Sequence, residues 1–246
     1  MIVIPMAGMS SRFSQAGYEQ PKYMLPLYGK PLFDYCIGSF SAYFQQQSFL
    51  FIVRNMPGVQ AFIVERCRSL GINQYQIVLL DEATRGQAET VALGLLDADM
   101  ADNNGLLIFN IDTIRPGYRF PFTEPPQAYL EVFEGEGDGW SFAEACDVDP
   151  DKVIKTAEKK PISRWCSTGL YYFSSKKQFL ETYSRYADFA VETLQGGEYY
   201  IAPMYNLLID DGVDVRMHRI DADEVVFSGV PVEYEALLED ASWLHA

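Results

Sequence analysis

The sequence has few of the residues that build cross-linked or metal-bound small proteins. It contains four cysteines and two histidines among 246 residues. The cysteines are far apart and form no Cys-x-x-Cys pair, so neither a disulfide framework nor a structural zinc site is expected. We predict instead that the cysteines are small buried apolar residues.

Long apolar runs are also missing. The apolar start at residues 2–5 is too short for a signal peptide, and no stretch is long enough to span a membrane. Basic residues are scarce, with 19 Lys and Arg against 34 Asp and Glu and a formal net charge of −15. Such a chain repels a nucleic-acid backbone, whereas a free nucleotide can be held by a few cations and backbone N–H groups. We therefore expect a cytoplasmic protein with no membrane span and no nucleic-acid partner.

What is present is an alternation of strand and helix patterns, typical of an α/β fold with a mostly parallel central sheet. The first half predicts strands at 2–5, 49–53, 76–80 and 106–111, and helices at 32–44, 59–70 and 87–96. After residue 121 we expect strands at 128–133, 141–146, 153–157 and 168–173, and helices at 176–186, 200–209 and 232–244. No linker separates the halves, so we predict one domain over residues 1–246.

In a sheet of this kind, ligands bind beyond the carboxyl ends of the strands. The loop after the first strand contains the small residues Ala7, Gly8, Ser10 and Ser11, followed by Arg12. Small residues let backbone N–H groups approach a triphosphate, and Arg12 with Lys22 can neutralise the charge of a departing pyrophosphate. An ordinary strand-to-helix turn also uses Gly and Ser, but the nearby cations favour phosphate chemistry.

The order of these residues resembles that of the sugar nucleotidyltransferase family, the nucleoside-diphosphate-sugar pyrophosphorylases. Its pattern runs Ala-Gly-x-Gly-Ser/Thr-Arg, then Pro-Lys-x-x-Leu-Pro, then Gly-Lys-Pro, which is matched here by residues 7–12, 21–26 and 29–31. Ser10 departs from it, since family members often have a second glycine there. The resemblance implies a single-domain, Rossmann-like (GT-A-like) nucleotidyltransferase fold. Residues 1–120 would form its nucleotide-binding half and residues 121–246 its acceptor-binding half.

The resemblance also implies roles in nucleotide binding and catalysis. Ala7, Gly8, Ser10, Ser11, Arg12 and Lys22 would bind the nucleotide phosphates, and Gly86 would lie near the base. Asp112 ends the fourth predicted strand, where a carboxylate can bind Mg²⁺. An isolated Asp at a strand end is more often a turn or cap residue, but the predicted crevice favours the metal. Arg12, Lys22 and Asp112 are thus the expected catalytic residues.

The second half carries the expected acceptor site. Glu158 and Lys159 resemble the family's Glu-Lys-Pro segment, although Lys160 competes with Lys159 and such a run, taken alone, is more often a solvated turn than a site. Thr168 and Gly169 resemble its Thr-Gly-x-Tyr segment, and Glu198 its Gly-Glu-x-x-Ile segment.

Two positions depart from the thymidylyltransferase pattern. Pro203 and Phe227 stand where glucose-1-phosphate thymidylyltransferases have aspartates, which indicates a distinct branch and removes one expected metal ligand.

The expected reaction is Mg²⁺-dependent transfer of NMP from an NTP to a sugar phosphate, with release of pyrophosphate. Precursors of capsule or other surface polysaccharides are the products that the family resemblance suggests. A cytidylyltransferase for a non-sugar phosphate such as phosphocholine, a GT-A-like glycosyltransferase and a silent nucleotide-binding module remain alternatives. The base and the oligomeric state, including a homo-oligomer, are left open.

Overall fold

The computed structural model describes residues 1–245, and the side chains of residues 1–244. Seven α-helices are present in this range: α1 Ser11–Gln15, α2 Leu32–Gly38, α3 Val59–Leu70, α4 Gln87–Asp97, α5 Lys176–Tyr186, α6 Met204–Asp210 and α7 Pro231–Glu239. The strands are β1 Ile2–Met6, β2 Pro26–Leu27, β3 Lys30–Pro31, β4 Phe49–Arg54, β5 Tyr75–Leu80, β6 Leu106–Phe109, β7 Thr113–Ile114, β8 Ala128–Glu134, β9 Ser141–Ala145, β10 Val153–Glu158, β11 Trp165–Phe173, β12 Val215–Ile220 and β13 Val226–Phe227. Within residues 1–245, no helix is long and apolar enough to cross a membrane.

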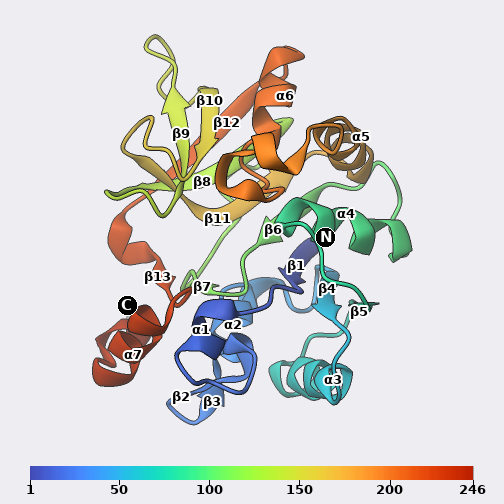
Figure 1. Cartoon of the computed structure of the whole chain (residues 1–246), viewed down its shortest axis with the longest axis vertical. Helices are drawn as coiled ribbons and strands as arrows, with labels where there is room; N and C mark the ends of the chain where they lie inside the picture. Colours follow the sequence, from blue (N-terminus) through green and yellow to red (C-terminus); the bar gives the residue numbers. More distant parts are fainter. Residues whose placement is uncertain (246) are drawn as a thin grey trace.

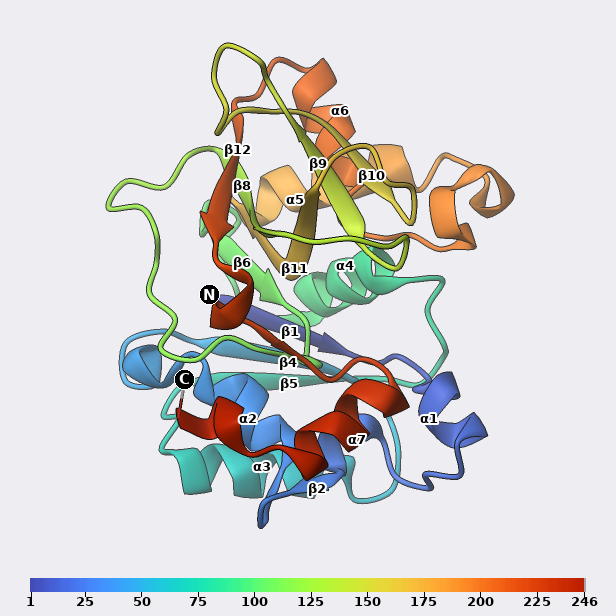
Figure 2. The same ribbon diagram turned by 90° about the vertical axis from the view of Figure 1, so that its left-hand side faces the viewer.

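One mixed nine-stranded sheet runs through both halves of the chain (Figures 1 and 2). Its main path has the order β10-β9-β11-β6-β1-β4-β5, and β8 joins β11 to β12. The strands β6, β1, β4 and β5 are parallel, as the strand–helix alternation predicts. β11 then pairs antiparallel with β6, β8 and β9, which attaches the second half to the first. The predicted α/β fold is confirmed.

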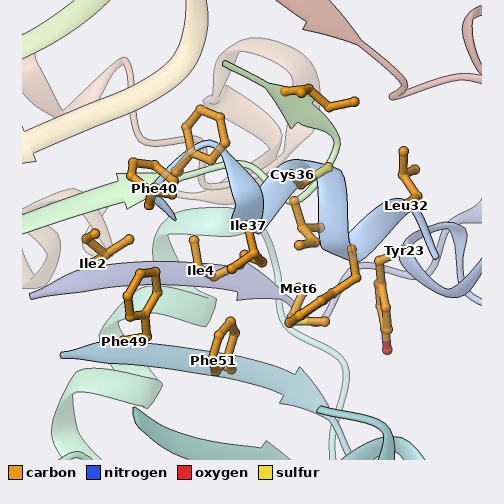
Figure 3. Packing of buried hydrophobic residues seen from close by; sticks show 14 of the residues in the cluster. Ile2, Ile4, Met6, Tyr23, Leu32, Cys36, Ile37, Phe40, Phe49 and Phe51 are labelled. Atoms are coloured by element: carbon orange, nitrogen blue, oxygen red, sulfur yellow. The ribbon is translucent and has the colours of Figure 1, made fainter. Parts of the chain in front are cut away.

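The alternation of side chains along the parallel strands builds two cores. Ile2 and Ile4 of β1 face α2 and α3, and Figure 3 shows them with Phe49 and Phe51 of β4. Val3, the residue between them, faces the opposite core, which is covered by α4, α5 and α6. Both faces of β1 and β6 are buried, and every residue of these two strands is apolar. The site must therefore form at the strand ends.

Helix and strand ends follow from local chemistry. α3 coincides with its predicted range because Gly71 adopts φ 76° at its C-terminal cap. α5 also coincides, and its cap Ser175 accepts a hydrogen bond from the Gln178 N–H.

Other predictions were wrong in detail. The predicted helix 200–209 starts only at Met204, after Pro203, and β12 was missed. Cys36, Cys67 and Cys166 are buried as expected, whereas Cys146 is half-buried.

The C-terminal segment returns to the first half of the chain. β13 pairs with β7, and α7 then packs beside α1, as Figure 2 shows. Tyr234 of α7 is buried against Phe13 of α1 and donates a hydrogen bond to the Pro26 carbonyl at 2.6 Å. Residues from the two ends of the chain therefore meet beside the loop after β1.

Candidate functional site

Two adjoining cavities open at the carboxyl ends of the parallel strands. The first, about 370 Å³, is lined by the loop after β1 and is called the loop pocket. The second, about 390 Å³, lies among β9, β10 and β11 and is called the sheet pocket. Four residues line both pockets: Gln87, Asn110, Asp112 and Tyr200. The predicted crevice thus consists of two compartments that share one wall.

The loop pocket gathers the small residues expected at a phosphate site. Ala7, Gly8, Ser10 and Ser11 line it, together with Lys22. Ser10 adopts a left-handed conformation with φ 50°, which turns the chain sharply from β1 into α1. Its carbonyl accepts a hydrogen bond from the Ser14 N–H at 3.1 Å. The departure from glycine at this position is therefore accommodated by an unusual backbone conformation.

Lys22 and Asp112 form an ion pair at the boundary between the pockets. The Lys22 Nζ contacts Asp112 Oδ2, and the two side chains are 19% and 23% exposed. Asp112 follows β6, and its carbonyl accepts hydrogen bonds from the Ser228 N–H and Oγ, each at 2.9 Å. These bonds fix the backbone at Asp112, whose side chain lines both pockets. Two of the three predicted catalytic residues are therefore in contact.

Gly86 lines the loop pocket at a position where only glycine fits. It adopts φ 148°, and an added Cβ would lie 2.5 Å from the backbone nitrogen of Tyr199. The Tyr199 N–H donates to the Arg85 carbonyl at 2.9 Å, and the Ala88 N–H donates to the Tyr199 carbonyl at 2.8 Å. The start of α4 is therefore held against the segment that carries Glu198 and Tyr200.

The sheet pocket contains the predicted acceptor residues Glu158, Lys159, Thr168 and Gly169. Burial raises the pKa of the Glu158 carboxyl, while a hydrogen bond from the Ser141 hydroxyl and the nearby Lys159 charge oppose the rise. Lys159 has φ 51°, and its ammonium donates to the Tyr200 hydroxyl at 2.6 Å. Lys159 and Lys160 are both exposed, but only Lys159 lines the pocket, which favours Lys159 over Lys160.

Glu198 and Arg12 each line a different pocket from the one that was predicted. Glu198 was expected with the acceptor, yet it lines the loop pocket, because the hydrogen bond from Tyr199 to Arg85 draws its segment towards α4. Arg12 was expected with the nucleotide, yet it lines the sheet pocket.

Sequence reasoning missed several residues of the site. Gln87 and Asn110 are hydrogen-bonded side chain to side chain on the shared wall. Their signal was available, since Gln87 follows Gly86 and Asn110 precedes Asp112 by two positions. Trp140 and Glu233 also line the sheet pocket, but neither belongs to a quoted pattern. Phe227, which was noticed only as a departure, lines it too.

The donor atoms around Asp112 fit a magnesium ion that is held partly by its substrate. Among the described residues, no group of three or more His, Cys, Asp and Glu side chains could hold a metal alone. Mg²⁺ commonly uses one or two carboxylates together with substrate phosphates and water. Asp112 lines both pockets and meets this requirement, whereas a closed structural metal site does not fit.

Solved structures resemble this chain over nearly its whole length. The nucleoside-diphosphate-sugar pyrophosphorylase from Vibrio cholerae RC9 is 50% identical, over 98% of this chain and 100% of that chain, with a TM-score of 0.93. The inositol-1-phosphate CTP transferase from T. maritima has a TM-score of 0.73 at 14% identity, over 97% and 94% of the chains. A UDP-glucose pyrophosphorylase complexed with UDP-glucose has a TM-score of 0.72 at 12% identity, over 100% and 98%. The last two similarities concern the fold alone.

No protein-family model matches the chain, and no curated protein matches it by sequence. A Bacillus anthracis structure assigned to the glucose-1-phosphate thymidylyltransferases has a TM-score of 0.71 at 16% identity, over 97% and 93% of the chains, and this similarity also concerns the fold alone. Half of all positions are shared with the Vibrio cholerae protein along its full length. This chain therefore belongs to the nucleoside-diphosphate-sugar pyrophosphorylase family of enzymes.

Proposed function

We propose that this enzyme transfers an NMP group from an NTP to a sugar phosphate and releases pyrophosphate. The observation that carries the proposal is the Lys22–Asp112 pair on the boundary between two pockets. One compartment has the small-residue loop that suits a triphosphate, and the other has Glu158 and Lys159, which suit a phosphorylated acceptor. The α-phosphorus would then lie near the boundary, within reach of both substrates.

The reaction is an in-line displacement at the α-phosphorus. An acceptor phosphate oxygen forms the new P–O bond, and the bond between the α-phosphorus and the pyrophosphate oxygen breaks. No protein nucleophile is required, because the attacking oxygen already carries charge near neutral pH. Catalysis then depends on positioning and on neutralising charge. Lys22 would hold the nucleotide phosphates in the loop pocket, and Arg12, which lines the sheet pocket, would meet the charge that develops on the reacting phosphates.

We further infer that Asp112 would hold Mg²⁺ if the ion binds with the nucleotide. A divalent ion there supplies positive charge to the reacting phosphates. Lys22, which contacts Asp112 here, would pair with a nucleotide phosphate instead, and the Asp112 carboxylate would then be available to the ion. Glu158 accepts hydrogen bonds from acceptor hydroxyls, and Lys159 pairs with the acceptor phosphate.

The proposal divides the domain into a nucleotide-binding half, residues 1–120, and an acceptor-binding half, residues 121–246. Arg12, Asp112 and Glu198 cross this division, so each half would complete the other's pocket. We place the reaction in the cytoplasm, where NTPs and sugar phosphates occur. A supply of precursors for capsule or other surface polysaccharide is inferred from the family.

Pyrophosphate release tests the proposal. The protein is incubated with each of ATP, CTP, GTP, UTP and dTTP, with Mg²⁺, against sugar 1-phosphates and non-sugar phosphates. We expect release that requires both a nucleotide and a phosphorylated acceptor. Nucleotide binding without release for any pair would support a silent module, and glycosyl transfer from a nucleotide sugar would support the glycosyltransferase alternative.

A further inference from the structure

Two aromatic rings form part of the wall of the sheet pocket, and no role in the transfer reaction accounts for them. The Trp140 and Phe227 ring centroids are 4.6 Å apart at an interplanar angle of 56°. Behind them lies the buried Phe133, whose centroid is 5.2 Å from each. Trp140 and Phe227 are half-buried and line the pocket. Together they are called the aromatic wall.

Each ring of the aromatic wall belongs to a residue whose backbone is paired at or next to a proposed phosphate-binding residue, Asp112 or Lys159. Phe227 lies opposite Thr113 in the β13–β7 pair, one residue from Asp112. The Trp140 carbonyl accepts a hydrogen bond from the Lys159 N–H at 2.8 Å, and its indole N–H donates to the Glu136 carbonyl at 3.1 Å. An acceptor whose phosphate lay between Asp112 and Lys159 would share one pocket with these rings.

Polar groups next to the aromatic wall make the pocket amphipathic. Ser141 follows Trp140 directly, and its hydroxyl donates to the buried Glu158 carboxylate. The Tyr171 hydroxyl lies 3.4 Å from the Ser141 oxygen. A buried carboxylate needs hydrogen-bond donors, whereas an aromatic face needs apolar surface. A pyranose ring offers both, with C–H groups on its face and hydroxyls at its edge.

The geometry points to Trp140 and Phe227 as specificity-determining residues that select a pyranosyl phosphate, whose C–H face stacks on the aromatic wall while its hydroxyls meet Glu158. This inference rests on the proposed transfer reaction and names its acceptor class. It also gives Phe227 a role: the position that resembles a metal-binding aspartate in relatives contributes apolar surface to the acceptor here. An acyclic acceptor such as phosphocholine would provide no hydroxyl for Glu158.

Steady-state kinetics with matched variants test the inference. Trp140→Leu and Phe227→Leu remove the rings but keep apolar bulk, and Trp165→Leu is the control, because Trp165 lies outside the sheet pocket. We expect wild type to prefer hexose 1-phosphates to phosphocholine and glycerol phosphate. Each pocket variant should raise the acceptor KM roughly two- to tenfold, the range for one stacking contact, with little change in kcat. The control should leave both constants unchanged.

Two kinetic results would overturn the inference and leave the transfer reaction intact. One is a preference for phosphocholine, which would make the aromatic wall a site for a cation. The other is an unchanged acceptor KM in both pocket variants.

A binding measurement covers the case in which no acceptor yields pyrophosphate, the result that contradicts the proposed function. Trp140 is one of three tryptophans, and Trp165 and Trp243 lie outside the sheet pocket. Titration with a hexose 1-phosphate, in the presence of Mg²⁺ and an unreactive NTP analogue, should change the tryptophan emission. The change should disappear in Trp140→Phe and persist in Trp165→Phe. Unchanged emission across the hexose 1-phosphates in wild type would contradict stacking.

Discussion

Replacing Arg115 with Met would leave the Glu131 carboxylate buried without its principal partner. Glu131 is fully buried, and its Oε1 accepts from the Arg115 Nε at 3.0 Å and from the Thr168 hydroxyl at 3.2 Å. Arg115 also pairs with Glu224 at 3.1 Å, just before β13. The cluster therefore ties β8 to Thr168 of the sheet pocket and to the segment that leads into the aromatic wall.

The magnitude follows from the burial of the pair. Removing one partner of a buried ion pair costs about 3–5 kcal/mol. At roughly 2–4 °C per kcal/mol for a domain of this size, the melting temperature should fall by about 6–20 °C near pH 8.

The loss should depend on pH in a definite direction. Burial raises the pKa of Glu131, and Arg115 opposes that rise, so the variant's pKa is higher still. A carboxyl with a raised pKa in the folded state binds a proton more readily there than in the unfolded chain. Its destabilising effect is therefore greatest above the folded pKa and shrinks as the pH falls through it.

Thermal unfolding at pH 8 and pH 5.5 measures this effect. Arg115→Met should lose more stability at pH 8 than at pH 5.5, relative to wild type at each pH. The double variant Arg115→Met/Glu131→Gln removes the uncompensated charge and should recover much of the loss at pH 8. The reasoning is refuted if the single variant loses less than about 1 kcal/mol, or if the double variant is no more stable than the single one.

Two further predictions concern Gly86 in the loop pocket and Tyr234, which packs against α1. Gly86→Ala should weaken nucleotide binding at least tenfold, on the order of 1.4 kcal/mol, because its Cβ would collide with the Tyr199 backbone; equilibrium titration with the preferred NTP measures this, and unchanged affinity would contradict it. Tyr234→Leu should lower kcat about tenfold and leave the acceptor KM unchanged, because Tyr234 packs on Phe13 and so positions the neighbouring Arg12; Tyr234→Phe, which keeps the ring, should retain most of the activity, and equal losses in both variants would contradict a role for packing.

Much of the fold could be predicted because its signals are local. Apolar periodicity located β1, β4 and α3, and a capping glycine or serine ended or began the helices that coincide with their predicted ranges. The predicted helix 200–209 begins too early, because a proline disfavours the helical conformation in the residue before it and α6 starts only after Pro203. β12 begins with apolar and polar residues in alternation from Val215 to His218, but Arg219 breaks the alternation, and the strand was not predicted for that reason.

The position of the site was predicted from the strand ends, and its candidate residues were predicted from the family patterns. Asp112 and Lys22 are 90 positions apart in the sequence. The rule that ligands bind at strand ends predicted that the segments carrying them line one crevice. The aromatic wall could not be predicted in this way. Trp140 and Phe227 meet only because β13 returns to β7, a long-range pairing that leaves no periodic signal in the sequence. The compartment of Glu198 likewise depends on a long-range backbone hydrogen bond.

Pyrophosphate release by Asp112→Asn is the most direct test of the central claim that the Lys22–Asp112 boundary performs nucleotidyl transfer. Asp102→Asn is the matched control, because Asp102 is exposed and lies outside both pockets. With the substrate pair that wild type prefers, Asp112→Asn should lose at least about a hundredfold in kcat while keeping its thermal stability, and the control should match wild type. Wild-type turnover by Asp112→Asn would contradict the account.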